Sequence, residues 1–394
     1  MVDQAPAGAE SLRRRNAAAV LRTLRYDGPA SRSELAARTG LAKATVGTIV
    51  AGLEQAGAVT EVEEVRSGER GRPGRRVSLA GGRHVGVGFE ANVEYVSAVV
   101  LDLSGAVRRR ATRSVTDVRK VTLALDALAV EVAAGLEIDQ QSAIGAAVAV
   151  PGLIGGDDRT IAWTPNLGIT GTEVAEAVDR AFGWPGRTLV SNDADCGALA
   201  ELRHGAGDGS AHLLYLTGTV GIGAGLVHDG RVVRGAQGFA GEVGHLPIGE
   251  AGARCGCGRT GCWEASVGLH ALLAAVGMGE LDTPEQTAEA VASAAESDPA
   301  VREGIARVGR WLGRGLAIVT GVLDPEAIVL GGYFAPLGDL ILEPARAELD
   351  ATLATAVQAR PELRLGALGT GSAALGAAER ALGAVLAGDL DLAP

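Results

Sequence analysis

Apolar residues in the first 60 positions recur at helical spacing, and the first stripe predicts an amphipathic helix that ends at the turn 27–29. That stripe comprises Leu12, Val20, Leu21 and Leu24. A second helix is expected from Ser31, since Ser31 and Glu34 have the spacing of a capping box, to Gly40. A third helix should end near Gly57, with Leu41, Val46, Ile49, Val50 and Leu53 as its apolar positions. Two helices joined by a short glycine-containing turn are typical of a helix-turn-helix.

Two short apolar runs, Val59–Val65 and Val77–Leu79, predict a pair of strands after the third helix. The loop between them is broken by glycines and holds five arginines: Arg66, Arg70, Arg72, Arg75 and Arg76. Such a loop is often only a solvated turn, and a three-helix module can also be a protein-docking unit. The combination of a helix-turn-helix with an arginine-rich loop between two strands favours a DNA-binding winged helix. The expected DNA contacts are Lys43, Thr45 and Thr48 of the third helix and Arg70, Arg72, Arg75 and Arg76 of the wing.

From His84 onwards, short β-rich runs alternate with alanine-rich helical segments. The expected strands are Val85–Phe89, Tyr95–Leu101, Ala106–Arg110, Ala143–Val150, Thr188–Ser191, Leu213–Leu216, Ala224–Val227 and Ala327–Leu330. Helices are expected at 119–136, from near Cys196, at 286–322 and at 343–358. This alternation predicts an α/β body whose core strands are largely parallel.

The distribution of charge separates the same two parts of the chain. Residues 1–83 carry 14 Lys and Arg against 9 Asp and Glu, whereas the remainder carries 22 against 38. A basic head on an acidic body is expected when one domain binds a polyanion and the other does not. Neither a signal peptide nor an apolar run long enough to cross a bilayer is recognisable, so a cytoplasmic protein without membrane contact is expected.

Three of the four cysteines and one histidine lie within 18 positions: His245, Cys255, Cys257 and Cys262. This spacing offers three thiolates and one imidazole, a set that suits tetrahedral Zn²⁺ and leaves no position open for catalysis. The alternative is a group of small buried thiols, but the glycines between these cysteines leave little core for them. The sequence therefore predicts a structural zinc ion.

Polar side chains follow several of the expected strands or flank the cysteine cluster. They are Asn166, Asn192, Asp193, Glu242, His245 and Glu264. Taken alone, Asp193 is explained equally well as a helix cap and as a ligand contact. As a group, these amide, carboxylate and imidazole side chains match what a neutral, polyhydroxylated ligand requires of its binding site.

The body resembles the ROK family of repressors, open reading frames and sugar kinases. The motifs that carry the resemblance lie at 151–154, 164–168, 192–193, 241–245 and 255–264, and the matching region spans about residues 84–380. The resemblance implies a two-lobed, actin-like, hexokinase-type (ribonuclease H-like) fold, with sugar contacts from the six polar residues above. It also implies that His245 serves both sugar and zinc and that Asp193 occupies the general-base position of the kinases. With the winged helix in front, the whole chain is similar to the family's transcription factors.

Three domains are expected on this basis: a winged helix at 1–83, a first lobe at 84–192 with the helix 371–387 packed back onto it, and a second lobe at 193–370. Kinases of the family carry an Asp-x-Gly-Gly-Thr-type phosphate turn, but this chain has Gly88-Phe89-Glu90-Ala91-Asn92-Val93 at that place, without the two glycines and the hydroxyl. Glycines of the other nucleotide loops remain at Gly218, Gly221, Gly223, Gly331 and Gly332, where the turns themselves could require them.

The sequence therefore predicts a sugar-responsive transcriptional regulator, most often a repressor, that binds double-stranded operator DNA and has no catalytic residues. A homodimer or homotetramer is expected, because two heads must grip two half-sites about 34 Å apart. Two alternatives remain: an active sugar kinase that also carries a DNA-binding head, and a DNA binder that responds to no ligand.

Overall fold

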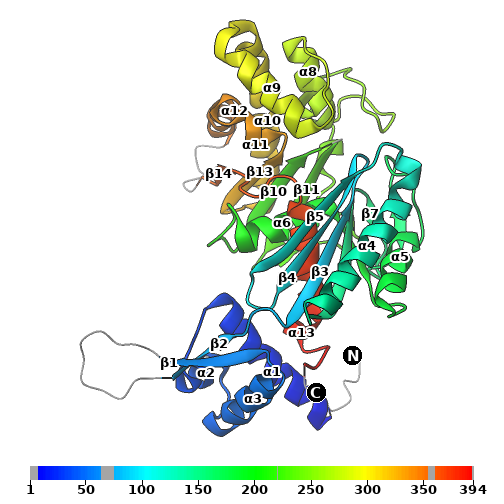
Figure 1. Ribbon diagram of the computed structural model, residues 1–394. Coiled ribbons are helices and arrows are strands. Elements are labelled where there is room, and N and C mark those ends of the chain that lie inside the picture. Colours follow the sequence, from blue (N-terminus) through cyan, green and yellow to red (C-terminus); the bar gives the residue numbers. More distant parts are fainter. Residues whose placement is uncertain (1–7, 64–74, 220, 354–359, 393–394) are drawn as a thin grey trace.

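The computed structural model describes residues 8–63, 75–219, 221–353 and 360–392. The chain forms three parts, a small N-terminal head and two larger lobes (Figure 1). The C-terminal helix returns to the head, where its last turns lie beside the first helix. Among the helices of the described residues, none is long and apolar enough to cross a membrane.

The head is a helix-turn-helix followed by a two-stranded antiparallel hairpin. Its elements are α1 (Ala9–Tyr26), α2 (Arg32–Thr39), α3 (Lys43–Gln55), β1 (Val59–Glu63) and β2 (Arg75–Leu79). The predicted capping box is present: the Ser31 hydroxyl accepts from the Glu34 amide at 3.2 Å, and Glu34 accepts from the Ser31 amide at 2.7 Å. One expected core residue is not buried, since Leu12 is 54% exposed in the first turns of α1.

The two lobes each contain a five-stranded mixed sheet. The strand order is β5-β4-β3-β6-β9 in the first lobe and β12-β11-β10-β13-β14 in the second. In each sheet two neighbouring pairs are antiparallel and two are parallel, so the expectation of largely parallel strands is wrong for half of the pairs. The strands are β3 (His84–Ala91), β4 (Tyr95–Asp102), β5 (Val107–Ser114), β6 (Ser142–Val150), β9 (Leu189–Asn192), β10 (Leu213–Gly218), β11 (Ile222–His228), β12 (Arg231–Val232), β13 (Ala327–Gly332) and β14 (Glu362–Leu365).

Helices cover both sheets. In the first lobe they are α4 (Val121–Ile138) and α5 (Glu173–Phe182), with a small hairpin formed by β7 (Leu153–Ile154) and β8 (Ile161–Trp163). In the second lobe they are α7 (Glu264–Val267), α8 (Leu269–Val276), α9 (Pro284–Ser297), α10 (Pro299–Leu323), α11 (Phe334–Leu337) and α12 (Asp339–Thr352). The helix expected at 286–322 is in fact two helices, because Asp298 caps a new helix that has Pro299 in its first turn.

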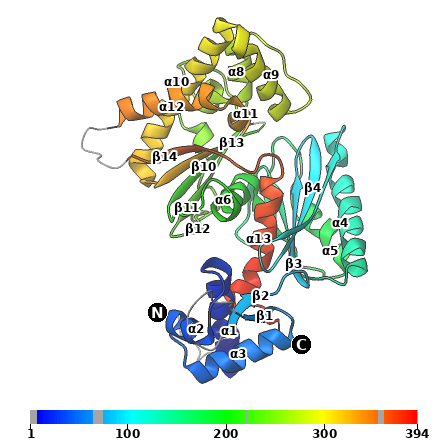
Figure 2. The same cartoon turned by 60° about the vertical axis from the view of Figure 1, so that its left-hand side comes forward.

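Two helices, α6 (Asp193–His204) and α13 (Ser372–Ala387), lie between the sheets (Figure 2). Helix α6 packs on β10 and β11, whereas α13 packs on β3, β4 and β6 and also contacts α1 of the head. Glycines permit this close approach: a Cβ atom at Gly376 would lie 1.8 Å from the carbonyl oxygen of Cys196, and one at Gly88 would lie 1.9 Å from that of Ala374. Helix α13 thus touches the head, the first sheet and α6. The domain boundaries drawn from the sequence stay predictions.

Candidate functional site

The cysteine cluster forms a compact set of metal ligands in the second lobe. The ligand atoms of His245, Cys255, Cys257 and Cys262 all lie within 4.8 Å of one another, and the cysteines are free thiols. Cys257 Sγ lies 3.7 Å from Cys262 Sγ, and Cys255 Sγ lies 3.8 Å from His245 Nδ1. A tetrahedral Zn²⁺ with Zn–S distances of about 2.3 Å requires sulfur atoms roughly 3.8 Å apart. The four residues therefore fit a tetrahedral metal ion.

Two carboxylates, Glu242 and Glu264, lie next to this cluster in the chain. Glu264 begins α7 directly after the last cysteine; one of its carboxylate oxygens accepts from the Cys255 thiol at 3.3 Å, and the other accepts from the Ile222 amide at 2.9 Å. Glu242 immediately precedes the short 3-10 turn Val243–His245. Burial raises the pKa of Glu242, His245 lowers it, and the charge of Glu264 raises it further.

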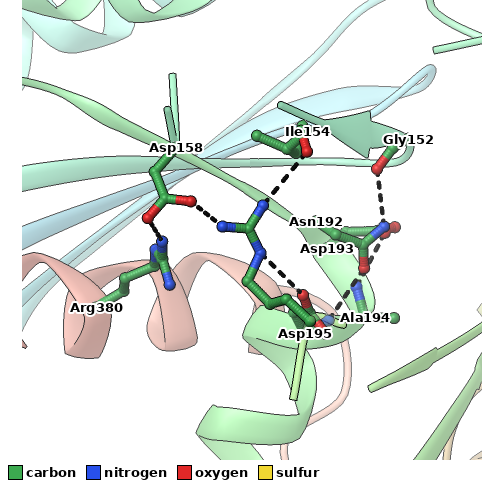
Figure 3. A network of polar contacts seen from close by, with 9 residues as sticks. Gly152, Ile154, Asp158, Asn192, Asp193, Ala194, Asp195 and Arg380 are labelled. Atoms are coloured by element: carbon green, nitrogen blue, oxygen red, sulfur yellow. Dashed lines mark hydrogen bonds and ion pairs between the residues drawn. The ribbon is translucent and has the colours of Figure 1, made fainter. Parts of the chain in front are cut away.

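Asn192 and Asp193 lie at the junction of β9 and α6 (Figure 3). The helix begins three residues before the expected Cys196, because Asn192 is its N-cap and accepts from the Asp195 amide at 3.1 Å. The Asn192 amide nitrogen donates to the Gly152 carbonyl oxygen at 3.1 Å, and Asp193 accepts from the Ala194 amide at 2.9 Å.

Asp193 is the most perturbed of the predicted sugar contacts. Burial, aided by the nearby charge of Glu242, raises its pKa to about 6, although backbone hydrogen bonds act in the opposite direction. Asp193 and Glu242 therefore lie within electrostatic reach of each other, as do Glu242 and Glu264. The structure brings these three carboxylates and His245 into one neighbourhood.

Asn166 lies apart from that neighbourhood. It is exposed in the loop after β8, in a surface depression that it shares with Val121 of α4 and Glu173 of α5. No hydrogen bond joins it to Asn192 or Asp193 in the described part of the chain. Its role as a sugar contact stays a prediction.

Asp193 also lines a cavity of about 210 Å³ between the two lobes, together with Glu90, Tyr95 and Gly218. Glu90 is 4% exposed, and burial raises its pKa to about 7, with hydrogen bonding to Tyr95 acting in the opposite direction. It accepts from the Tyr95 hydroxyl at 2.6 Å and from Ser97 at 3.4 Å. The carboxylate at the place of the phosphate turn is thus held by the lobe's own side chains.

Close packing explains the glycines that the family resemblance places in nucleotide loops. A Cβ atom at Gly218 would lie 2.1 Å from the ring of Tyr333, and one at Gly331 would lie 2.3 Å from the Tyr215 hydroxyl. Gly332 has φ +60° and would place a Cβ atom 2.0 Å from the Gly218 carbonyl oxygen. The corresponding distances are 2.5 Å to a Glu264 oxygen at Gly221 and 3.1 Å to Ala194 Cβ at Gly223. The packing of the second lobe therefore leaves no room for a side chain at Gly218, Gly331 and Gly332, and little room at Gly221 and Gly223.

Sequence reasoning missed an ionic cluster beside Asn192 and Asp193 (Figure 3). Asp158, in the β7–β8 hairpin, pairs with Arg234 and lies 2.6 Å from Arg380 of α13. Arg234 also approaches Asp195 at 3.9 Å. These residues come from four separate segments, and no spacing in the sequence indicates that they meet.

In the head, Lys43 and Thr48 are exposed on α3, and Thr45 is half-buried. Thr45 and Thr48 also line a groove between α3 and α1. Of the wing residues, Arg75 lies 3.4 Å from Glu61, and Arg76 donates to the Pro29 carbonyl oxygen at 2.7 Å. Arg70 and Arg72 lie outside the described residues. DNA contact by these residues stays a prediction.

The fold and the site define a class of protein: a winged-helix head joined to a two-lobed, actin-like body with a sugar-type cleft and a metal-ligand cluster. Residues 87–383 match the model of the ROK family, and residues 15–63 match that of the MarR family. The chain belongs to the ROK family.

Similar proteins include both regulators and kinases. The chain is 27% identical to the xylose repressor of Bacillus subtilis over 371 residues, which cover 91% of this chain and 92% of the relative. It is 34% identical to a glucokinase of Halalkalibacterium halodurans over 247 residues, 59% of this chain and 74% of the kinase. A crystal structure of a ROK family transcriptional regulator, a homologue of the E. coli MLC protein, superposes with a TM-score of 0.81 at 24% identity, covering 96% of this chain and 98% of that one. The predicted fold class is confirmed.

Proposed function

We propose that this chain is a sugar-responsive transcriptional repressor. Its head binds operator DNA, and its cleft binds a sugar or sugar derivative. One observation supports this most strongly: the head and the sugar-type cleft belong to one chain, and α13 contacts both the head and the lobes. Relatives that align over both parts include the xylose repressor, whereas the aligned glucokinase covers only 59% of the chain.

The proposed sugar contacts are Asn166, Asn192, Asp193, Glu242, His245 and Glu264. Asp193, Glu242 and Glu264 would accept hydrogen bonds from successive hydroxyl groups, since ionised carboxylates are acceptors only. Asn192 already donates to Gly152 and accepts from the Asp195 amide, so a sugar would compete with, or add to, an ordered amide. Sugar binding would favour one separation of the lobes, and operator affinity would follow that separation.

The metal cluster would hold Zn²⁺ through His245, Cys255, Cys257 and Cys262 in a closed, structural site. A structural zinc supplies folding free energy and fixes the loop that joins its ligands. Because Glu264 contacts Cys255 and Glu242 precedes His245 by three residues, that loop determines where both carboxylates lie.

Phosphoryl transfer is the alternative function, and the site supports it less well. Phosphate turns need glycines so that backbone amides can approach the anion, but Ala91 and Asn92 carry Cβ atoms at this place. We therefore propose that Asp193 binds sugar without acting as a general base. Two heads on one operator require a dimer or a tetramer, which is also part of the proposal.

Two measurements test this function. Thermal unfolding of the zinc-loaded full chain is followed with D-xylose, D-glucose, D-mannose and N-acetyl-D-glucosamine, each with and without MgATP. Operator affinity is then measured on a duplex selected from a random library. We expect one sugar to raise the melting temperature and to change operator affinity, with no effect of MgATP. Sugar-dependent consumption of ATP in a coupled assay would favour the kinase, and the absence of any sugar effect would favour a ligand-independent DNA binder.

A further inference from the structure

Two adjacent residues of α13, Glu379 and Arg380, point to different parts of the molecule. The Glu379 side chain is 3% exposed, pairs with Arg25 of α1, and lies 2.6 Å from His204 Nε2 at the end of α6. Arg25 is itself 4% exposed and also donates to the Leu103 carbonyl oxygen at 2.8 Å. A buried ion pair therefore joins the DNA-binding head to the body.

Further directional contacts hold α1 in this place. The guanidinium of Arg203, the neighbour of His204 on α6, lies over the Tyr26 ring with 4.2 Å to its centroid. Arg22 donates to the Leu386 carbonyl oxygen of α13. Because these contacts depend on direction and distance, a small displacement of α13 or α6 would change how the head is held.

Arg380 connects the same helix to the boundary between the lobes (Figure 3). Its guanidinium lies 2.6 Å from Asp158 of the first lobe, and Asp158 also pairs with Arg234 of the second lobe. Arg234 in turn approaches the Ile154 carbonyl oxygen at 3.4 Å and Asp195 of α6 at 3.9 Å. Any change in the separation of the lobes must change this cluster, which lies beside the start of α6.

We propose that Arg380 and Glu379 are positioning residues that couple the separation of the two lobes to the docking of the DNA-binding head on α13. Arg380 contacts Asp158, so its position depends on the Arg234–Asp158 ion pair between the lobes. Glu379 forms an ion pair with Arg25 of the head. The two residues are adjacent on one continuous helix, so a movement of the partners of either side chain is passed to the other through the rigid helical backbone. The inference rests on the proposed function, because it concerns how the sugar site regulates DNA binding.

The test uses the zinc-loaded full chain and two variants, Arg380→Gln and, as a matched control, Arg310→Gln. Arg310 forms an exposed pair with Glu303 on α10, so the control also removes one arginine from an ion pair. The probe is the sugar of the four-sugar panel that gives the largest thermal shift in the unaltered protein. Calorimetry gives sugar affinity, fluorescence anisotropy gives operator affinity with and without that sugar, and hydrogen exchange reports on the amides of α1 and of residues 192–194.

In the unaltered protein and in the Arg310→Gln control, we expect the sugar to change operator affinity about 5- to 150-fold and to change exchange in α1. In Arg380→Gln, sugar affinity should stay within about threefold and residues 192–194 should still be protected, while the change in operator affinity falls below about twofold. Exchange in α1 should then no longer respond to sugar. Arg380→Lys, which keeps a charge for Asp158, should restore part of the response.

An unchanged sugar response of operator affinity in Arg380→Gln would overturn the coupling role. If Arg380→Gln fails to fold, Arg380→Lys and Glu379→Gln take its place: each must fold, bind sugar normally and show a reduced response, and a full response in both would overturn the role. If no sugar changes operator affinity of the unaltered protein, the proposed function fails and the coupling fails with it. If sugar changes the operator affinity of the unaltered protein and of the variants equally, the coupling role is refuted and the proposed function stands.

Discussion

Replacing Asp193 by Asn should stabilise the protein and abolish its response to sugar. Asp193 is buried at the start of α6, and its pKa rises from an ordinary value of 3.8 to about 6, chiefly through burial. A carboxyl group with a raised pKa in the folded state binds its proton more tightly there than in the unfolded chain. Its ionisation therefore lowers the free energy of unfolding progressively as the pH rises from 3.8 to about 6, and the full cost remains above that range.

The magnitude follows from the two pKa values. With 3.8 in the unfolded chain and about 6 in the folded protein, ionised Asp193 costs about 3 kcal/mol at pH 8 and about 1.6 kcal/mol at pH 5. Asparagine has nearly the same shape and can still accept from the Ala194 amide, but it has no charge to bury. We therefore expect Asp193→Asn to be more stable than the unaltered protein by about 3 kcal/mol at pH 8 and by about half of that at pH 5.

Urea unfolding at pH 5 and pH 8, followed by circular dichroism in zinc-containing buffer, measures this difference. Asp208→Asn serves as the control, because Asp208 is exposed and the same loss of charge there should change stability little at either pH. The reasoning is refuted if Asp193→Asn is less stable than the unaltered protein at pH 8, or if its gain in free energy of unfolding is the same at pH 5 and pH 8. Either result would show that burial does not destabilise the ionised Asp193. Calorimetry should show sugar binding weakened at least tenfold in the same variant, since a carboxylate acceptor has been lost.

Three further changes test other parts of the structure. Cys257→Ser should remove most bound zinc, measured by atomic absorption, and lower the melting temperature, whereas Cys196→Ser should leave the zinc content unchanged because Cys196 lies outside the cluster. Lys43→Ala should weaken operator binding for all sequences alike and reduce the slope of affinity against salt by about one; an unchanged slope would exclude a phosphate contact. Gly376→Ala should lower the free energy of unfolding by about 1–3 kcal/mol or more, because its Cβ atom would lie 1.8 Å from the Cys196 carbonyl oxygen. Normal stability in urea unfolding would contradict the close packing of α6 on α13.

Local signals in the sequence predicted the parts of the structure that depend on neighbouring residues. The capping box at Ser31 and Glu34 and the metal-ligand cluster are both formed by short segments, and the structure contains both. The break between α9 and α10 also had a local signal, since Asp298 followed by Pro299 is a typical helix start, but the continuous helical pattern concealed it.

Contacts between distant segments left no such signal. Asp158, Arg234 and Arg380 come from a hairpin, a loop after an edge strand and the last helix, and each is an ordinary charged residue in its own segment. The packing of α13 against both α6 and the first sheet likewise appears in the sequence only as scattered small residues. Asn166 is predicted as a sugar contact from its motif alone; it lies on an exposed loop that lines a surface depression, and its role stays a prediction.

The glycine turns bear directly on the choice between sensor and kinase. In sequence, Gly218, Gly331 and Gly332 are compatible with nucleotide binding, because phosphate loops require close backbone approach. In the structure, Tyr333, Tyr215 and a backbone carbonyl occupy the space that any side chain at these positions would need. The glycines are therefore explained by the packing of the second lobe, and their presence is no evidence for ATP. What distinguishes the two functions is the segment from Glu90 to Val93, where Ala91 and Asn92 stand in place of the glycines of the kinases' phosphate turn. The Cβ atoms of these two residues limit how closely a phosphate group can approach the backbone amides, so the cleft suits a neutral sugar better than a triphosphate.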